Sequence, residues 1–379
     1  MLVRIAVFLF LTLCIPCLKG QEPVPETEKI ALIFAGDIMG HEEQIKAALD
    51  PETHTYNYDS VFYYIRDDIS EADIAIGNLE VTLAGQPFRG YPQFSSPAEL
   101  AVACKNAGFD FLVTANNHSA DRGKKGIVST INRLDSLGIP HTGTFGDRAQ
   151  RDTLYPALIH KNGFTLSVLN YTYGTNGIAV PPPVIVNLID RNVIARDIEK
   201  AKRQNPDAII AIMHWGTEYD TIPSKSQTDL VKFLLDNGVD LVIGSHPHVI
   251  QKIVWTRDND TAKGKVIAYS LGNFVSNQRR TWTDGGTMVR IILEKNGGST
   301  IISDVGYILT WVYTPVEDST KEFFILPCEK FEDKPEFFLK ASDFQKMKAY
   351  IQNARHLLKS QNINVEEITD LPRNPEVAY

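Results

Sequence analysis

The chain has 379 residues, 43% hydrophobic and 22% charged, which is the composition of an ordinary globular protein. Its formal net charge of −8 argues against a dedicated nucleic-acid surface, which would need a basic patch. The length allows a large core and at most two or three domains.

Residues 1–20 have the features of a secretory signal. A positive charge precedes the apolar run Ile5–Pro16, which is too short to span a bilayer comfortably. Gly20 suits the cleavage position, and residues 21–28 form a short polar linker. We therefore expect secretion across the cytoplasmic membrane, to the periplasm or cell envelope. Two alternatives stay open, which are an uncleaved anchor and a lipid attached to one of the two cysteines in this segment.

Two further cysteines, Cys104 and Cys328, are too few for a disulfide framework. Cys104 lies in an apolar helical pattern, which favours a buried free thiol. A lone bridge between the two cysteines is the alternative.

From residue 29 onward, apolar strands alternate with helices, which predicts a mostly parallel sheet covered on both faces. The predicted strands are Ile30–Ala35, Ala72–Ile76, Phe109–Thr114, Leu166–Asn170, Ala208–Met213 and Val239–Ile243. The predicted helices are Glu99–Asn106, Gly126–Leu137, Val193–Gln204 and Lys225–Asp236. Three of these helices are followed closely by a glycine, the residue that most often ends a helix.

After His248 the pattern changes to strands with short connections, which predicts an antiparallel portion. These strands are Val249–Val254, Lys265–Ser270, Thr287–Leu293, Ile301–Leu309 and Phe323–Leu326, and an amphipathic helix follows at Ser342–Leu358. We therefore expect one large α/β domain at residues 29–295. A C-terminal extension of strands and a helix, residues 296–379, would pack on the same domain.

Polar side chains follow several of the predicted parallel strands. The segment Gly108–His118 can be laid on Gly238–His248, since each has a glycine, an Asp two residues later, an apolar strand and then polar groups. Ligands bind beyond the carboxyl ends of strands in open parallel sheets, so these polar groups should converge on one rim. The residues expected there are Asp37, Asn78, Glu80, Asn117, His118, His214, His246 and His248.

This set of nitrogen and oxygen donors suits a divalent metal such as Mn, Zn or Fe. A metal site of this kind activates water and holds a phosphoryl or acyl group. The candidate metal ligands are Asp37, Glu80, Asn117, His214, His246 and His248. His118 is the candidate catalytic residue, because it could protonate a leaving group.

Further rim positions are candidates for substrate binding. They are Asn78, Trp215, Glu218, Asn273, Arg279 and Arg280. The two arginines could bind a substrate anion, and a solvated loop is the alternative. Trp215 is equally explained as a packing residue. The sequence contains no Gly-x-Ser-x-Gly elbow, no phosphate loop and no dinucleotide fingerprint after the first strand.

Six short motifs, in this order, resemble the CapA family of capsule-synthesis proteins, which are linked to poly-γ-glutamate export or assembly. They are Phe-Ala-Gly-Asp37-Ile-Met, Gly-Asn78-Leu-Glu80, Ala-Asn-Asn117-His118-Ser-Ala-Asp121, His214-Trp-Gly-Thr-Glu218-Tyr, Gly-Ser-His246-Pro-His248 and Ser-Leu-Gly-Asn273-Phe. That family looks like a relative of the calcineurin-like metallophosphoesterases. The resemblance implies their four-layer α/β/β/α sandwich, here with a C-terminal strand and helix extension.

By the same resemblance, the general acid would be His118 and the metal ligands would be Asp37, Asn117, His214, His246 and His248. Two positions depart from the phosphoesterase pattern. Met39 stands where that pattern has a histidine, and Asn78 stands where it has a bridging aspartate. A bridging carboxylate holds two cations together against their repulsion, so one bound ion is expected rather than two.

The expected function is metal-dependent hydrolysis or transfer on an anionic cell-envelope polymer or a phosphoester. Two alternatives remain, which are a non-catalytic accessory protein that binds polyanionic capsule polymer and a general phosphodiesterase. The expected partners are the anionic substrate and other capsule-synthesis proteins of the envelope. Nucleic acid is not expected, and membrane contact is expected only through an uncleaved signal or a lipid anchor.

Overall fold

The computed structural model describes residues 28–257, 264–296, 298–317 and 320–369. The expected signal segment, residues 1–20, lies outside the described residues. Among the helices that are described, none combines the length and the apolar composition needed to cross a membrane.

The first of two large sheets has nine strands within the described residues. Its order is β18-β15-β14-β1-β2-β3-β4, while β13 pairs with β1 and β19 with β15. Strands β1 to β4 are parallel, and β14 runs antiparallel to β1. The strands are β1 (Lys29–Ile38), β2 (Ile74–Leu79), β3 (Phe111–Val113), β4 (His141–Thr142), β13 (Asn273–Val275), β14 (Gly285–Asn296), β15 (Ser299–Tyr313), β18 (Phe324–Pro327) and β19 (Glu366–Glu367).

The second sheet has six described strands in the order β11-β12-β10-β9-β7-β6. Its four central strands are parallel, and the two edge strands are antiparallel to their neighbours. The strands are β6 (Ala157–Lys161), β7 (Phe164–Thr172), β9 (Ala208–His214), β10 (Leu241–Ser245), β11 (Ile253–Thr256) and β12 (Lys265–Ala268). Two small ribbons pair β5 (Thr144–Phe145) with β8 (Ile185–Val186) and β16 (Val316–Glu317) with β17 (Thr320–Lys321).

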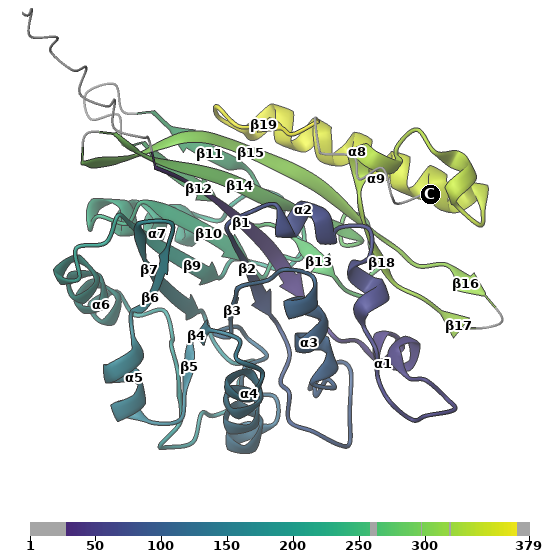
Figure 1. Ribbon diagram of the computed structural model, residues 1–379, viewed down its shortest axis with the longest axis horizontal. Coiled ribbons are helices and arrows are strands. Elements are labelled where there is room, and N and C mark those ends of the chain that lie inside the picture. Colours follow the sequence, from purple (N-terminus) through teal and green to yellow (C-terminus); the bar gives the residue numbers. More distant parts are fainter. Residues whose placement is uncertain (1–27, 258–263, 297, 318–319, 370–379) are drawn as a thin grey trace, which may run out of the picture.

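Helices cover the outer faces of both sheets (Figure 1). The described residues form the helices α1 (Glu42–Ala48), α2 (Arg66–Ser70), α3 (Glu99–Asn106), α4 (Gly123–Leu137), α5 (Arg148–Leu154), α6 (Arg191–Arg203), α7 (Lys225–Asp236), α8 (Cys328–Phe331) and α9 (Ala341–Gln361), with 3₁₀ turns at Asp59–Phe62 and Pro335–Phe337. Helices α2 and α3 pack on the first sheet, and α6 and α7 pack on the second.

Alternating side chains along each strand explain the layers. Leu32 and Ile74 of the first sheet meet Leu166 and Ile210 of the second in one buried cluster. Ile33, the neighbour of Leu32, faces the opposite way and joins the cluster under the helices. The expected helix–sheet–sheet–helix order is therefore confirmed.

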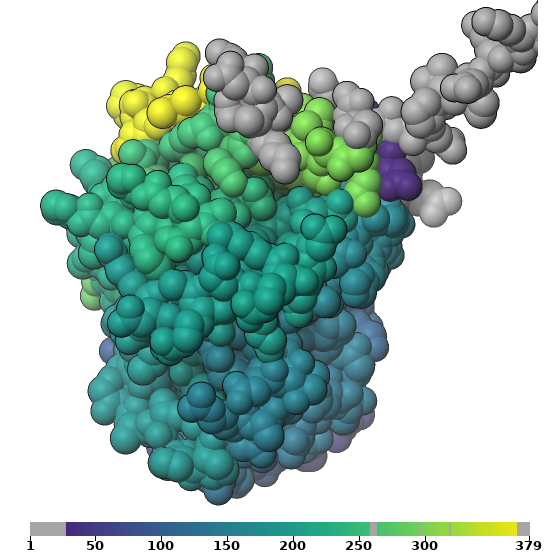
Figure 2. Space-filling model, turned by 90° about the vertical axis from the view of Figure 1, so that its left-hand side faces the viewer, coloured from purple at the N-terminus to yellow at the C-terminus, as the bar shows by residue number. Residues whose placement is uncertain are grey.

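The C-terminal residues are built onto these layers. Strands β15 and β18 continue the first sheet, and α9 adds Met347, Tyr350 and Ile351 to the core between the sheets. In the space-filling view, the yellow C-terminal residues lie at the top, beside the green strands and above the teal residues of the second sheet (Figure 2).

The antiparallel prediction after His248 was only partly right. Strands β14, β15 and β18 are antiparallel, but β12 pairs in parallel with β10, and β13 in parallel with β1. The predicted strand Val249–Val254 was also misplaced, because β11 is Ile253–Thr256. Short connections indicate strands but do not identify their partners. Cys104 and Cys328 are both buried free thiols, so the alternative of a bridge is wrong.

Candidate metal centre

The carboxyl ends of the central strands of both sheets meet at one buried site. Strand β1 carries Asp37, which lies opposite Asn78 of β2 in the first sheet. In the second sheet, His214 ends β9 opposite Ser245, the last residue of β10. The polar residues of the rim are therefore placed by strand register.

Two groups of three potential ligands form this site. Glu80, His214 and His246 make one group, and Asp37, Glu80 and His248 make the other. Within each group the donor atoms all lie within 4.8 Å of one another, and every member is buried. Glu80 belongs to both groups, so it stands at the centre of the cluster.

The carboxylate of Glu80 accepts and donates no hydrogen bond in the part of the chain that the structure describes. Both carboxylate oxygens are buried without a hydrogen-bond partner, and so is Nδ1 of His246. Burial, followed by the nearby charge of Asp37, raises the pKa of Glu80 well above its usual range. Buried polar atoms are nearly always paired, so unpaired atoms in one cluster need an explanation. A divalent cation supplies it, because it would accept lone pairs from these atoms. The residues fit such an ion.

The histidines are in the right protonation state for ligands. Burial lowers the pKa of His214 well below its usual range and lowers that of His246 to about 3. A metal-binding imidazole must be neutral, so that one ring nitrogen keeps its lone pair. Both rings meet this condition near neutral pH.

The backbone after β10 is strained to aim two of these histidines. His246 and His248 have φ angles of 100° and 58°, values that residues other than glycine seldom adopt. The amide of His246 donates to Asp37 Oδ2 at 3.3 Å. Strain of this kind persists only where the surrounding structure enforces it, and it is concentrated at functional sites.

Amide side chains hold the ligand residues in place. Asn78 Nδ2 donates to Asp37 Oδ1 at 2.8 Å, so this residue supports a candidate ligand. Asn117 Oδ1 lies 2.7 Å from His214 Nε2, and Asn273 Oδ1 lies 3.0 Å from His248 Nδ1.

His118 lies beside the cluster and is paired with a carboxylate. Its Nδ1 lies 2.7 Å from Asp121 Oδ2, which also accepts the amide N–H of Phe94 at 2.7 Å. The Phe94 ring packs edge-on against the imidazole, with 4.6 Å between centroids. Asp121 was not predicted as a site residue, although its spacing three residues after His118 was available as a signal.

Other predicted residues lie around the centre. Trp215 is buried, and its Nε1 donates to the carbonyl of Tyr269 at 2.9 Å. Glu218 is exposed. Arg279 and Arg280 line a separate cavity next to the site. The sequence prediction missed Tyr173, which is 47% exposed and has its ring 4.5 Å from that of His246.

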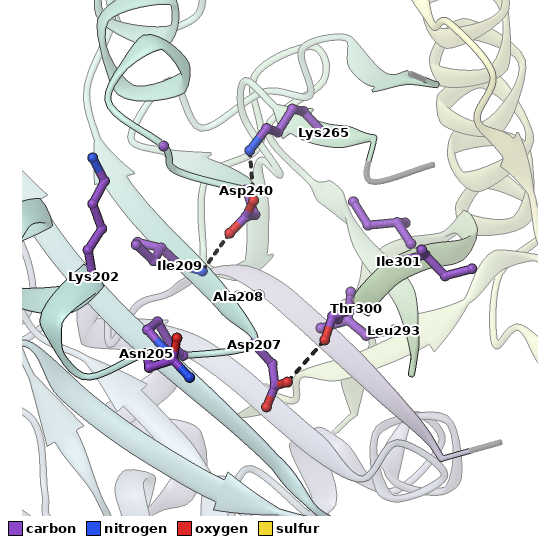
Figure 3. Close-up of a pocket in the computed structure, with 13 residues that line it drawn as sticks. Lys202, Asn205, Asp207, Ala208, Ile209, Asp240, Lys265, Leu293, Thr300 and Ile301 are labelled. Atoms are coloured by element: carbon purple, nitrogen blue, oxygen red, sulfur yellow. Dashed lines mark hydrogen bonds and ion pairs between the residues drawn. The ribbon is translucent and has the colours of Figure 1, made fainter. Parts of the chain in front are cut away.

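A second pocket, shown in Figure 3, lies at the opposite ends of the strands, next to the start of β9. Its acidic groups already have partners. Asp240 accepts the amide N–H of Ile209 and pairs with Lys265, and Asp207 accepts the hydroxyl of Thr300 at 3.0 Å (Figure 3). These carboxylates already bind groups of the protein near the beginnings of the strands. The rim at the carboxyl ends of the strands is therefore the better candidate site.

Comparison with known proteins agrees with these motifs. The model of the family described as bacterial capsule synthesis protein PGA_cap matches residues 31–278. The capsule biosynthesis protein CapA of Bacillus anthracis is 31% identical over 79% of this chain and 73% of its own length. The PGA biosynthesis protein CapA of Bacillus subtilis (strain 168) is 30% identical over 74% of this chain and 72% of its own length.

Among solved structures, the calcineurin-like phosphoesterase YfkN from Bacillus subtilis is similar, with a TM-score of 0.43 and 13% identity. The similarity covers 88% of this chain and 100% of that one. Because this TM-score is low, the four-layer assignment rests on the sheet order and the packing of this chain itself. The family is shown by the sequence matches: the chain belongs to the PGA_cap family of bacterial capsule synthesis proteins.

Proposed function

We propose that this protein is a metal-dependent hydrolase or transferase that acts on an anionic cell-envelope polymer or a phosphoester. The observation that carries the proposal is Glu80, a buried carboxylate without a hydrogen-bond partner among the described residues, between His214, His246 and His248. The printed names of the relatives, which refer to capsule and PGA biosynthesis, support the polymer as the substrate class.

Six residues would hold the ion. Those with donor atoms in the cluster are Asp37, Glu80, His214, His246 and His248, and Asn117 offers an amide oxygen next to His214. The chemistry that a divalent ion supplies in such a site is Lewis-acid polarisation of a phosphoryl or carbonyl oxygen. Because Glu80 is shared by both ligand groups, the metal content of the purified protein decides between one ion and two.

His118 would deliver a proton to the leaving group. With Asp121 as acceptor, Nδ1 of His118 carries a hydrogen, so Nε2 is the nitrogen left for proton transfer. Phe94 packs against the ring and limits its rotation. Asp121 acts through His118, so it is a positioning residue.

We further propose that the protein acts outside the cytoplasmic membrane, in the periplasm or cell envelope, next to other capsule-synthesis proteins. Residues 1–20 support this proposal by their sequence. Cell fractionation followed by N-terminal sequencing tests it. A cytoplasmic protein with residues 1–20 intact would contradict it, and recovery in the membrane fraction would favour the anchored forms.

The metal content of the purified protein tests the proposed activity. We expect about one or two equivalents of a transition metal in the wild type, and loss of metal in His246→Ala/His248→Ala, which removes two donor rings. The matched control is His160→Ala/His356→Ala, since both of these histidines are exposed and lie outside the cluster.

Hydrolysis of bis(p-nitrophenyl) phosphate and of a γ-linked glutamate oligomer should follow metal content across these proteins. A wild-type protein that binds no metal after reconstitution would refute the hydrolase proposal. The accessory role, binding of polyanionic polymer without catalysis, would then remain.

A further inference from the structure

A cavity of about 520 Å³ next to the metal centre has four cationic side chains in its lining. Arg279 and Arg280 follow β13, Lys321 belongs to β17, and Lys346 lies on α9. Asp284 is the acidic residue among the lining side chains. Segments from three parts of the chain thus bring four positive charges to one hollow.

Three of these cations form no ion pair with the residues that the structure describes. Within the described ranges, no carboxylate oxygen lies within 4.0 Å of the charged groups of Arg279, Arg280 or Lys321. Asp284 is already engaged, since its Oδ2 accepts Nε1–H of Trp311 at 2.8 Å. Asp284 and Glu43 act on Arg279 and Lys321 only from a distance, so the lining keeps a net positive charge.

The cations also repel one another. Burial lowers the pKa of Lys321, and the nearby charge of Arg279 lowers it further. Arg279 donates to carbonyl groups of its own loop, those of Ser276 and Gln278, and Lys321 donates to the side chain of Asn277. An anion bound among these groups would relieve their repulsion.

Two contacts tie this cavity to the metal centre. The guanidinium of Arg280 lies 4.6 Å from the centroid of the Tyr219 ring, which is 6.3 Å from the ring of His248. Asn273 donates to the carbonyl of Thr283, in the loop after β13 that carries both arginines, and its oxygen lies 3.0 Å from His248 Nδ1. Asn273 therefore contacts both His248, a candidate ligand, and the loop that lines the cavity.

We propose that the cavity is an anion subsite that holds one acidic group of a polyanionic chain while a neighbouring group lies at the metal centre. This inference rests on the proposed function and narrows its substrate to chains with repeated carboxylate or phosphate groups. Arginine binds either group through two parallel N–H donors, and Arg280 is exposed for this purpose. A small phosphoester, by contrast, would occupy the metal centre without occupying this cavity.

Calorimetric titration of the metal-loaded protein tests this proposal. The probes are a γ-linked hexaglutamate and, separately, a linear polyphosphate of similar charge. The test variant is Arg280→Gln/Lys321→Gln. The matched control is Arg203→Gln/Lys359→Gln, which removes the same charge from exposed positions on α6 and at the far end of α9.

We expect the test variant to bind the preferred probe at least about tenfold more weakly than wild type, because two charge-assisted contacts are lost. The control should change affinity less than about twofold, and added salt should weaken binding by the wild type. The probe that binds more tightly assigns the repeated group as carboxylate or phosphate. Arg280→Gln alone should give a smaller loss, and it alters an exposed side chain.

Equal binding by wild type and test variant would overturn the proposal, and so would a wild type that binds neither probe. Metal content, measured on the same samples, reports separately on the metal centre. A protein that holds metal but no polyanion would keep the proposed hydrolase and remove the subsite. A protein that binds polyanion through these cations but holds no metal would keep the subsite and remove the proposed hydrolase.

Discussion

Replacing Glu80 with glutamine should stabilise the metal-free protein and abolish its metal site. Asp37 remains ionised: burial alone would raise its pKa, but the hydrogen bond and charge of His248 lower it below its ordinary value. An oxygen of Glu80 lies within 4.8 Å of one of Asp37. At an effective dielectric constant of about 20, two such charges repel by about 3 kcal/mol. Glutamine removes this repulsion, and its amide can donate to Asp37.

The effect should depend on pH. The pKa of Glu80 is raised in the native state, so the native state holds this proton more tightly than the unfolded chain. The wild type therefore loses stability as pH rises above about 4.3, the value of an unperturbed Glu, until the raised pKa is passed. A protonated Glu80 resembles glutamine, so the two proteins should be nearly equal below about pH 4, where Glu80 is protonated in the native and the unfolded state alike. At pH 8 the variant should be more stable by up to about 3 kcal/mol.

Urea denaturation in EDTA, and again with excess Mn²⁺ or Zn²⁺, measures both parts of this prediction. An ion at a thousand times its dissociation constant should add about 4 kcal/mol to the wild type and much less to Glu80→Gln. Glu218→Gln removes an exposed rim carboxylate that raises the pKa of Glu80 less than Asp37 does, so as the control it should change both values much less. A Glu80→Gln protein that is less stable than wild type in EDTA at pH 8, or that gains equally from metal, would refute the reasoning.

Two further substitutions test other parts of the structure. Asp121→Asn should lower kcat on a phosphodiester about 10²-fold and shift the pH–rate profile, with bound metal unchanged, because it removes the acceptor that orients His118. The double variant Asp121→Asn/His118→Ala should have the same kcat as His118→Ala alone. Lys330→Met should destabilise the fold by about 3–5 kcal/mol at pH 8 in urea denaturation, because it leaves the buried Asp68 carboxylate unpaired. Burial raises the pKa of Asp68 to about 6, so this loss should shrink at pH 5.

Each of these two has an outcome that contradicts it. Additive losses in Asp121→Asn and His118→Ala would mean that Asp121 does not act through His118. Adding Asp68→Asn to Lys330→Met should restore much of the stability. A double variant as unstable as Lys330→Met alone would assign the loss to packing of the lysine stem.

Local chemistry let the sequence determine most elements. Helices Glu99–Asn106 and Lys225–Asp236 have the bounds that were expected, because apolar spacing and a following glycine mark helix limits within the chain itself. The rim could be predicted because polar residues follow apolar strands in the sequence. Asp37 and His214 both lie at the carboxyl ends of such strands, which is where open parallel sheets bind ligands.

Tertiary structure alone decided how these side chains divide their roles. Asn78 and Glu80 are two residues apart, yet the first donates to Asp37 while the second has no hydrogen-bond partner among the described residues and belongs to both candidate ligand groups. Lys321 joins Arg280 across some forty residues of chain, and its strand gave no sign of that partner. Periodicity reports which face of an element is buried, but a ligand set depends on atoms from distant segments that meet only when the two sheets pack.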